Sequence, residues 1–536
     1  MAGPDLHLNA CENFIAFLGG IMKKRVLGLA AGAAMALSLV SCGGKNTAAK
    51  ADKGEDYNIV MQIVTFGNEF SGIADVENAI NKIVEPEIGV TVTLVPVAAW
   101  DLTTTSSLQI TSGEKLDLML ILPMGAGLDN VTNYSSRNML TPLNDLYAKY
   151  GKDIDCCIGS LAKVGYVGDE LYAVPANYYA GDGYGFVARK AVVEELGFNF
   201  EEGKIYTASD LEPLFAAYKA KYGEGYYPVA MYSDIKPFNS FAAVDEMGSA
   251  AHGVLINYGD TKVVNEFATP EYKAYTTKMH EWYEKGYIHP DAATIKESFT
   301  NLLPTKKYLG AFSAVPGSDG MDAVAANSSQ VGEELIAIKL MDDYATTTIA
   351  SYGMWAIPVT SENPEKVMQF LNILYQDREL YSDVDSILAA GLEGKSYEIV
   401  ESLGGSKAIV KYPEGVTPVT VPFEQMLPVY GNQFTVPKSA PLTAKIYDQF
   451  ASYNSDIAKK NRYSRAFGYT FDTSKVQAQV AAVENVISQY RVLLDLGTVD
   501  PDEVLPVFNE ALENAGIEDV IKENQRQLDD WLAKQK

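Results

Sequence analysis

The segment YNIVMQIVTF (residues 57–66) opens the region, 57–122, that decides the fold class. It is β-branched and apolar almost throughout, which is typical of a strand buried on both faces of a sheet. VTVTLV (90–95) and LDLMLIL (116–122) have the same character, and a stretch that predicts a helix lies between successive strands. A strand–helix–strand–helix–strand order with short connections predicts a parallel sheet of the α/β class.

The predicted carboxyl ends of these strands are the first place to expect a ligand, because parallel sheets bind ligands beyond them. In this chain the ends are Phe66–Glu69, Trp100-Asp101 and Pro123–Gly127. The chain is rich in aromatic residues, with 33 Tyr, 20 Phe and 4 Trp. An aromatic face suits the apolar C–H face of a sugar ring, and neighbouring Asp, Asn and Glu side chains suit its hydroxyl groups.

Several aromatic and polar residues stand at predicted strand ends or crossings rather than on helix faces. We expect Trp100 and Trp355 to stack on sugar rings, and Asp101 and Glu69 to accept hydrogen bonds from hydroxyl groups. For each aromatic residue the alternative is ordinary packing in the core, which we favour for Trp282 and Trp531 because they stand at helical spacing. The predicted ligand-binding residues are Phe66, Asn68, Glu69, Trp100, Asp101, Asn177, Tyr178, Tyr179, Tyr232, Phe312, Tyr352 and Trp355.

Three closely spaced glycines, Gly181, Gly183 and Gly185, follow the short predicted strand 171–175. Glycine permits backbone conformations that other residues resist, so this density indicates a crossing between two lobes. The last hundred residues are predicted to be helical. Val480, Val483 and Ile487 belong to a continuous apolar seam there, which is typical of a helix packed on the body of a protein.

The N-terminal region has the three parts of a secretory signal: basic residues at 23–25, an apolar run at 26–40 and a small residue before Cys42. The run of about 15 residues is short of the roughly 20 that span a bilayer, which disfavours a transmembrane anchor. Leu39–Cys42 resembles the lipobox of bacterial lipoproteins, in which the cysteine is acylated. An ordinary cleaved signal with a chance cysteine is the alternative. The following residues lack large apolar side chains, which is typical of a flexible tether.

Composition and motifs exclude several classes of function. A net charge of −26 makes nucleic acid an improbable partner, because the protein would repel phosphate groups. His252, His280 and His289 are far apart and form no metal-ligand motif, and the chain has no GxSxG or Walker motif. Cys156 and Cys157 are adjacent and predict packed thiols rather than a disulfide framework. We therefore expect no cofactor, no metal and no catalytic residues.

Further motifs, taken in order along the chain, resemble one family. The chain is similar to the family 1 extracellular solute-binding proteins, and within them to the long LipO-type lipoproteins of Gram-positive bacteria. The matching stretches are ITSGEKLDL (110–118), LTPLNDLYAKYGKDI (140–154), WYEKGYI (282–288), NPEKVMQFLNILY (363–375), GLEGKSY (391–397), YGNQF (430–434) and the C-terminal run 471–532.

This resemblance implies a two-lobed periplasmic-binding-protein-like fold with a hinge and a helical C-terminal layer. It implies a carbohydrate ligand, an oligosaccharide in our interpretation, captured in the interlobe cleft and delivered to ABC permease subunits. We expect a monomer on the extracellular face of the cell membrane, attached only through the lipid on Cys42. The expected divisions are 1–21 as a segment preceding the true start, 22–41 as signal peptide, 42–56 as lipidated tether, 57–176 with about 300–345 as lobe 1, 177–299 with about 346–440 as lobe 2, and 441–536 as the helical C-terminal domain.

Three alternatives stay open at this point. A peptide could occupy the same long cleft. A surface glycosidase would need a carboxylate pair about 5–10 Å apart across the cleft, and 69 acidic residues prevent the sequence from singling out such a pair. An adhesin without a small ligand would lack a hinge.

Overall fold

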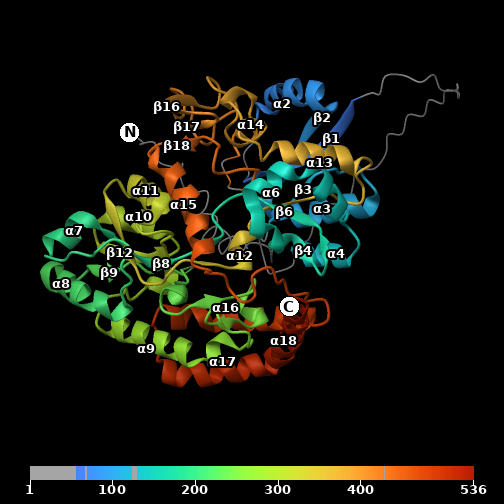
Figure 1. Cartoon of the computed structure of the whole chain (residues 1–536). Coiled ribbons are helices and arrows are strands. Elements are labelled where there is room, and N and C mark those ends of the chain that lie inside the picture. Colours follow the sequence, from blue (N-terminus) through green and yellow to red (C-terminus); the bar gives the residue numbers. More distant parts are fainter. Residues whose placement is uncertain are drawn as a thin grey trace, which may run out of the picture.

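The computed structural model describes residues 56–66, 69–122, 130–233, 235–425, 427 and 429–535. The predictions for the signal peptide, the tether with Cys42, Asn68 and Pro123–Gly127 lie outside these residues. The described part of the chain forms two lobes, each with its own sheet and its own cluster of buried apolar side chains (Figure 1). None of the described helices is both long enough and apolar enough to cross a bilayer.

Lobe 1 contains the predicted parallel strands. β1 (Tyr57–Thr65) pairs in parallel with β2 (Val90–Ala98) along its whole length. A bridge between Met61 and Leu118 joins β1 in parallel to the segment that continues into β3 (Met119–Ile121). β15 (Met354–Ala356) then pairs antiparallel with both β3 and β6 (Ala173–Pro175). The buried, apolar strands of the sequence therefore form the core of one sheet, as predicted.

Helices cover this sheet and extend lobe 1. α2 (Ile73–Ile88) buries Val76, Ile80 and Val84, which recur at helical spacing. The other elements of lobe 1 either contribute apolar residues to its core or pair with an element that does. They are α3 (Leu102–Ser112), α4 (Val131–Ser136), α5 (Asn144–Tyr150), α6 (Lys152–Ile158), β4 (Tyr166–Val167), β5 (Glu170–Leu171), α12 (Thr347–Ala350), α13 (Pro364–Ile373), α14 (Val384–Ala390), β16 (Glu398–Gly404), β17 (Lys407–Lys411), β18 (Lys438–Ser439) and α15 (Lys445–Lys459).

Lobe 2 is built on a sheet in the order β13-β8-β12-β9, formed by β8 (Tyr184–Arg189), β9 (Tyr227–Val229), β12 (Tyr308–Ala314) and β13 (Leu335–Lys339). β12 runs antiparallel to β8 and parallel to β9. The remaining elements of lobe 2 are α7 (Lys190–Glu195), α8 (Glu212–Tyr222), β10 (Val244–Asp245), β11 (Leu255–Ile256), α9 (Pro270–Glu284), α10 (Phe299–Leu302) and α11 (Met321–Val331).

The structure reverses the predicted assignment of the two later segments. Residues 308–339, expected in lobe 1, supply β12 and β13 to the sheet of lobe 2. Residues 354–356, expected in lobe 2, form the middle strand between β3 and β6 in lobe 1. After β6 the chain passes to lobe 2 and returns at β14 (Tyr344–Ala345). Most of the buried apolar residues between these strands pack in lobe 2, although Ala180 and Met321 join the lobe 1 core.

The hinge is a short antiparallel pair between β14 and β7 (Gly181–Asp182). A Cβ atom on Gly181 would lie 2.2 Å from Tyr344 O, and one on Gly185 would lie 2.4 Å from Ile338 O. On Gly183 it would lie 2.6 Å from Asp343 Oδ1 and 2.8 Å from Lys339 Nζ. None of the three glycines has a positive φ. They do mark the crossing, as predicted, but they serve close approach rather than backbone freedom.

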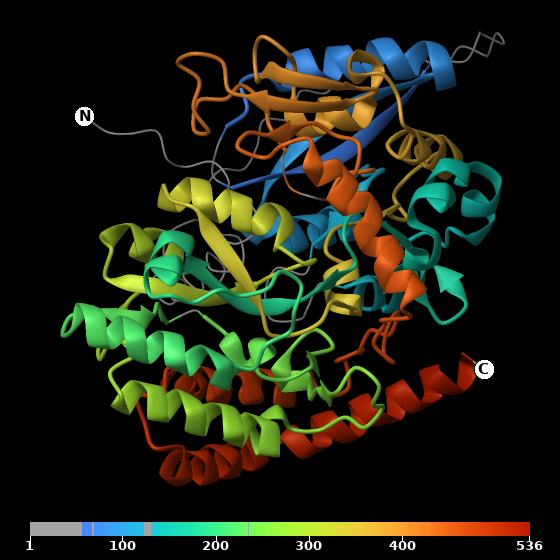
Figure 2. The ribbon, with the colours of Figure 1, turned by 60° about the vertical axis from the view of Figure 1, so that its left-hand side comes forward.

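The C-terminal helices divide between the lobes. α15 buries Phe450, Tyr453 and Ile457 in the core of lobe 1. α16 (Gln477–Asp495), α17 (Pro501–Ala515) and α18 (Ile517–Lys534) pack on lobe 2 and form a layer along one side of the molecule (Figure 2). The predicted helical layer is thus present, and it braces lobe 2.

Candidate functional site

One edge of the lobe 1 sheet gathers five of the predicted ligand-binding residues. The pairing of Thr65 with Ala98 places Phe66 beside the turn that carries Trp100 and Asp101. β3 and β6 both run antiparallel to β15, so the carboxyl ends of β3 and β6 meet the amino end of β15, which Tyr352 precedes. Phe66, Trp100 and Tyr352 are half-buried, whereas Glu69 and Asp101 are exposed.

The corresponding edge of lobe 2 contains Tyr232. β9 and β12 are parallel, with Val229 opposite Gly310, so the residues after β9 lie beside the carboxyl end of β12. The antiparallel pairing of Ala314 with Tyr184 places the start of β8 at this same edge. Because β8 is reached directly from the hinge strand β7, this edge lies on the hinge side of lobe 2. Tyr232 is only 8% exposed, so most of its surface packs in lobe 2.

Two of the predicted ligand-binding residues, Trp355 and Phe312, are buried in the cores, so these two predictions are wrong. Trp355 has no exposed surface, and its indole Nε1 donates a hydrogen bond to Val429 O at 2.8 Å. Phe312 is 3% exposed and stacks on Trp282, with ring centroids 6.0 Å apart. Both residues lie within a strand flanked by neighbours on either side, not beyond its end, so a ligand cannot reach them. Trp282 is fully buried, as its helical spacing predicted.

Asn177 also has a structural role. It is 5% exposed, and its side-chain Nδ2 donates to Asn432 Oδ1 at 2.8 Å. Its backbone N–H donates to Gly431 O at 2.8 Å, and its carbonyl accepts from Gln433 N at 3.1 Å. Asn177 therefore joins the segment leading to the hinge to a distant part of lobe 1, and it is not a ligand contact.

Tyr178 and Tyr179 lie in a group of rings that the sequence only partly indicated. Their ring centroids are 4.0 Å apart, and both pack on Phe450 of α15, at 5.6 and 6.2 Å. Tyr453 lies one helical turn later and contacts Tyr179 at 5.8 Å. Phe434 stacks on Phe450 at 5.3 Å. We call these five residues the hinge aromatic cluster. The spacing of Phe450 and Tyr453 on one helix face was the signal that could have found them.

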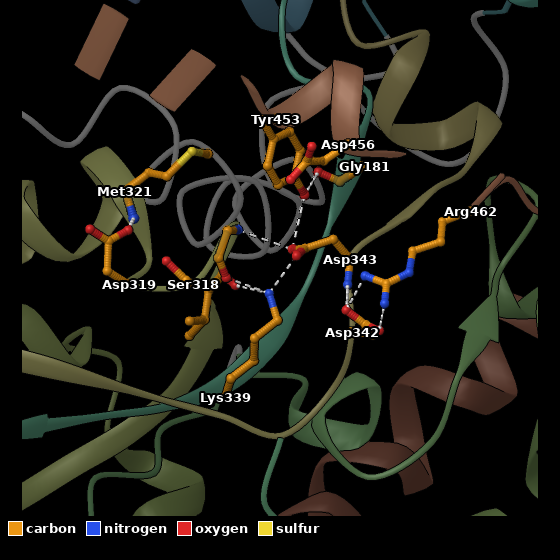
Figure 3. Close-up of polar contacts among 12 residues, drawn as sticks. Gly181, Ser318, Asp319, Met321, Lys339, Asp342, Asp343, Tyr453, Asp456 and Arg462 are labelled. Atoms are coloured by element: carbon orange, nitrogen blue, oxygen red, sulfur yellow. Dashed lines mark hydrogen bonds and ion pairs between the residues drawn. The ribbon is translucent and has the colours of Figure 1, made fainter. Parts of the chain in front are cut away.

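A pocket of about 350 Å³ adjoins this cluster. Its walls come from the turn after β12, the end of β13 and its following residues, and α15 with Arg462. Because β12 and β13 belong to lobe 2 while α15 packs on lobe 1, the pocket lies between the two bodies. Figure 3 shows Ser318, Asp319 and Met321 across from Tyr453 and Asp456. We call it the α15 pocket.

Buried polar contacts organise the floor of the α15 pocket. Lys339, 3% exposed, donates to Asp343 Oδ2 at 2.6 Å, to Val315 O at 3.3 Å and to Gly317 O (Figure 3). Asp343 Oδ1 accepts from Gly317 N at 3.1 Å. The Tyr453 hydroxyl lies 3.1 Å from Asp343 Oδ1 and 2.8 Å from Gly181 O.

Burial and nearby carboxylates determine the protonation of the Tyr453 hydroxyl. Burial, with Asp343 and Asp182 nearby, raises the pKa of Tyr453 well above its usual value, so its hydroxyl stays protonated and donates. Beside it, Arg462 forms an ion pair with Asp342 through both terminal nitrogens. The network therefore ties the end of β13 to the hinge strand and to α15.

Histidine and cysteine side chains in the described residues have structural surroundings. Burial lowers the pKa of His252 to about 4, and His280 Nδ1 lies 2.8 Å from Gly497 O. Cys156 and Cys157 are free thiols, and burial raises the pKa of Cys157 to about 12, which makes it a poor nucleophile. No group of three or more His, Cys, Asp or Glu side chains in the described part of the chain is arranged to hold a metal ion.

Comparison with protein families gives two matches. Residues 78–381 match the model described as "Bacterial extracellular solute-binding protein". Residues 465–533, which contain α16, α17 and all but the last residue of α18, match a domain of unknown function, DUF3502. The first match covers more than half of the chain and includes most of both lobes.

Known proteins resemble the chain over nearly its whole length. A carbohydrate ABC transporter substrate-binding protein of Streptococcus pneumoniae serotype 4 is 26% identical over 96% of this chain and 99% of the relative. The N-glycan transport solute binding protein NgtS of S. pneumoniae is 23% identical in sequence, with a TM-score of 0.72 over 90% of this chain and 100% of NgtS. A second structure of NgtS, in complex with Man5GlcNAc, has a TM-score of 0.60 over 90% of this chain and 99% of that one. The fold is therefore that of two-lobed solute-binding proteins.

Proposed function

The chain belongs to the bacterial extracellular solute-binding proteins, and from that membership we propose that it captures an oligosaccharide between its lobes and delivers it to an ABC permease. The observation that carries the proposal is the arrangement of the sheet edges. The carboxyl ends of the lobe 1 strands, with Phe66, Trp100 and Tyr352, and the hinge-side edge of lobe 2 both border the crossing formed by β7 and β14.

The residues at the lobe 1 edge have the chemistry that a sugar needs. Trp100 and Phe66 are half-buried residues, and an aromatic face can stack on the C–H face of a sugar ring. Glu69 and Asp101 are exposed carboxylates that can accept hydrogen bonds from hydroxyl groups. Both relatives described above carry carbohydrate or glycan transport in their names, which supports a sugar over a peptide.

Capture is proposed to proceed by lobe closure. A ligand that contacts both lobes stabilises the closed arrangement relative to the open one, and the permease then recognises the closed form.

We further propose that the mature protein is attached to the cell surface by acylation of Cys42 and does not chemically alter its ligand. The lipobox-like sequence ending at Cys42 supports the anchor. Replacing Cys42 by serine should abolish metabolic labelling with a radioactive fatty acid and leave the precursor unprocessed. Labelling that persists in the Cys42→Ser protein would contradict the anchor.

The test of the function is direct binding. Purified mature protein should bind Man5GlcNAc or kestose in isothermal titration calorimetry and melt at a higher temperature in its presence, because the ligand stabilises only the folded state. The recovered sugar should be unchanged by mass spectrometry. Binding of short peptides without any sugar binding would show a peptide receptor, and steady release of shorter sugars would show a glycosidase.

A further inference from the structure

We propose that the α15 pocket is a subsite for one neutral sugar unit of the captured oligosaccharide, and that its carboxylates exclude acidic sugars. This inference rests on the proposed function. It adds a second position, next to the hinge helix α15, to the stacking position at the lobe 1 edge.

The size of the pocket suits a sugar unit and not a whole oligosaccharide. Pockets that hold small ligands have volumes of roughly 300–1,000 Å³, and a volume of about 350 Å³ is near the lower limit. A longer ligand would therefore have to extend out of the pocket. The wall of the pocket adjoins the hinge aromatic cluster, because Tyr453 contacts Tyr179, and it includes Gly317, which follows the carboxyl end of β12.

The cations of the pocket are already engaged. Lys339 has three N–H donors and three acceptors around it: Asp343, Gly317 O and Val315 O. Arg462 binds both oxygens of Asp342. The third cation, Lys460, is exposed and lies 3.9 Å from Asp456. The pocket thus has no buried cation in reserve to pair with an anionic ligand.

The carboxylates, in contrast, keep capacity to accept hydrogen bonds. Asp319 accepts from Met321 N at 3.0 Å and from Gln449 Nε2 at 2.9 Å, one bond to each oxygen. A carboxylate oxygen can accept a second hydrogen bond. Asp456 is exposed on α15 and lines the same pocket. Hydroxyl groups of a sugar can donate to these two carboxylates, whereas an acidic sugar would bring like charges together.

The two walls give the subsite a role in closure. Asp319 precedes α11 in lobe 2, and Asp456 lies on α15, whose buried residues belong to lobe 1. A sugar unit that bonds to both carboxylates contacts both bodies at once. Its binding energy therefore favours the arrangement in which the two walls are at the correct separation.

A substitution that places a large side chain in the α15 pocket tests the proposed subsite. Ser452 is exposed on α15 and lines the pocket, and its hydroxyl bonds only to backbone carbonyls of its own helix. S452W should weaken the binding of Man5GlcNAc about tenfold or more while changing that of Man1GlcNAc less than about twofold. The matched control is A451W, because Ala451 is exposed on the same helix and is not part of the pocket. Calorimetric titration of all three proteins measures the effect.

The outcomes separate this inference from the proposed function. If the wild-type protein binds neither glycan, the proposed function and the subsite both fail for this ligand class. If the wild type binds, and S452W either binds Man5GlcNAc normally or loses both glycans equally, the subsite alone is overturned. A loss in A451W equal to that in S452W also overturns it.

A charge substitution tests the exclusion of acidic sugars. The wild type should bind a five-unit oligosaccharide ending in glucuronate at least about tenfold more weakly than its neutral counterpart of equal length. Replacing Asp456 by lysine should reduce this preference, because it exchanges an exposed negative charge of the wall for a positive one. Equal binding of the acidic and neutral sugars by the wild type would overturn the exclusion.

Discussion

Trp100 and Trp355 show how differently two tryptophans of the same lobe can be used. Trp100 lies in the turn after β2 and keeps part of its surface exposed at the sheet edge. Trp355 lies in the middle of β15, between β3 and β6, and is fully buried with its indole N–H bonded to Val429. An aromatic residue in the middle of a central strand is therefore buried in the core, whereas one just beyond a strand end stays accessible to a ligand.

The largest expected effect follows from removing the buried tryptophan. Trp355→Ala should lower the free energy of unfolding by about 3–5 kcal/mol, because it leaves a cavity and an unpaired carbonyl at Val429. Urea denaturation measures the loss. If Trp355→Ala were as stable as the wild type and lost only sugar binding, Trp355 would belong to the binding site and not to the core.

The same contrast between buried and edge positions applies to carboxyl groups. Glu266 is fully buried in lobe 2, 3.6 Å from Arg491 Nη2, and its carboxyl oxygens lack hydrogen-bond donors within the described structure. Burial raises the pKa of Glu266 to about 8, with Arg491 partly offsetting this rise. Glu69 and Asp101, at the edge of lobe 1, remain in contact with water.

Because the folded state holds the Glu266 proton more tightly than the unfolded state, this group favours folding most at acidic pH. The contribution of Glu266 to the free energy of unfolding falls by about 1.4 kcal/mol per pH unit as the pH rises from about 5 toward 8. Glu266→Gln should therefore flatten the decline in stability over this range. Denaturation at several pH values measures the slope, with exposed Glu271→Gln as the control. An unchanged slope in Glu266→Gln would show that Glu266 is ionised in the folded protein.

The smallest effect is expected from the half-buried tryptophan, Trp100. Trp100→Ala should reduce sugar affinity by about 2 kcal/mol if the ring is a central anchor. The free energy of unfolding should fall less in Trp100→Ala than in Trp355→Ala, because Trp100 is only half-buried in the folded protein. Calorimetry and denaturation on the same preparation separate the two effects. Unchanged affinity together with a large loss of stability would assign Trp100 to the core as well.

Local sequence patterns predicted the features that depend on neighbouring residues. The apolar strands of 57–122 and their shared carboxyl edge were predictable because buried parallel strands have a distinctive composition. The burial of Trp355 was not, since its partner Val429 is 74 residues away and the flanking strands come from distant parts of the chain. The lobe assignment of β12 and β13 failed for the same reason, because their pairing with β8, more than 100 residues earlier in the chain, leaves no local signal.

The residues around the α15 pocket were also hard to predict from local sequence patterns. Tyr178 and Tyr179 were predicted from the sequence as ligand-binding residues. Their contacts Phe450 and Tyr453 showed only the ordinary periodicity of a helix. Gly183 was predicted to supply backbone freedom, whereas its actual role is to leave space for Lys339 and Asp343. Such close approaches depend on three segments meeting, which the sequence alone does not show.

We propose that the two lobes close upon an oligosaccharide held between them. Small-angle X-ray scattering of the mature protein, with and without saturating Man5GlcNAc, tests this claim most directly. We expect the mature protein to have a smaller radius of gyration with the glycan than without it, under conditions where calorimetry shows complete binding. An unchanged radius of gyration at saturation would contradict capture by closure.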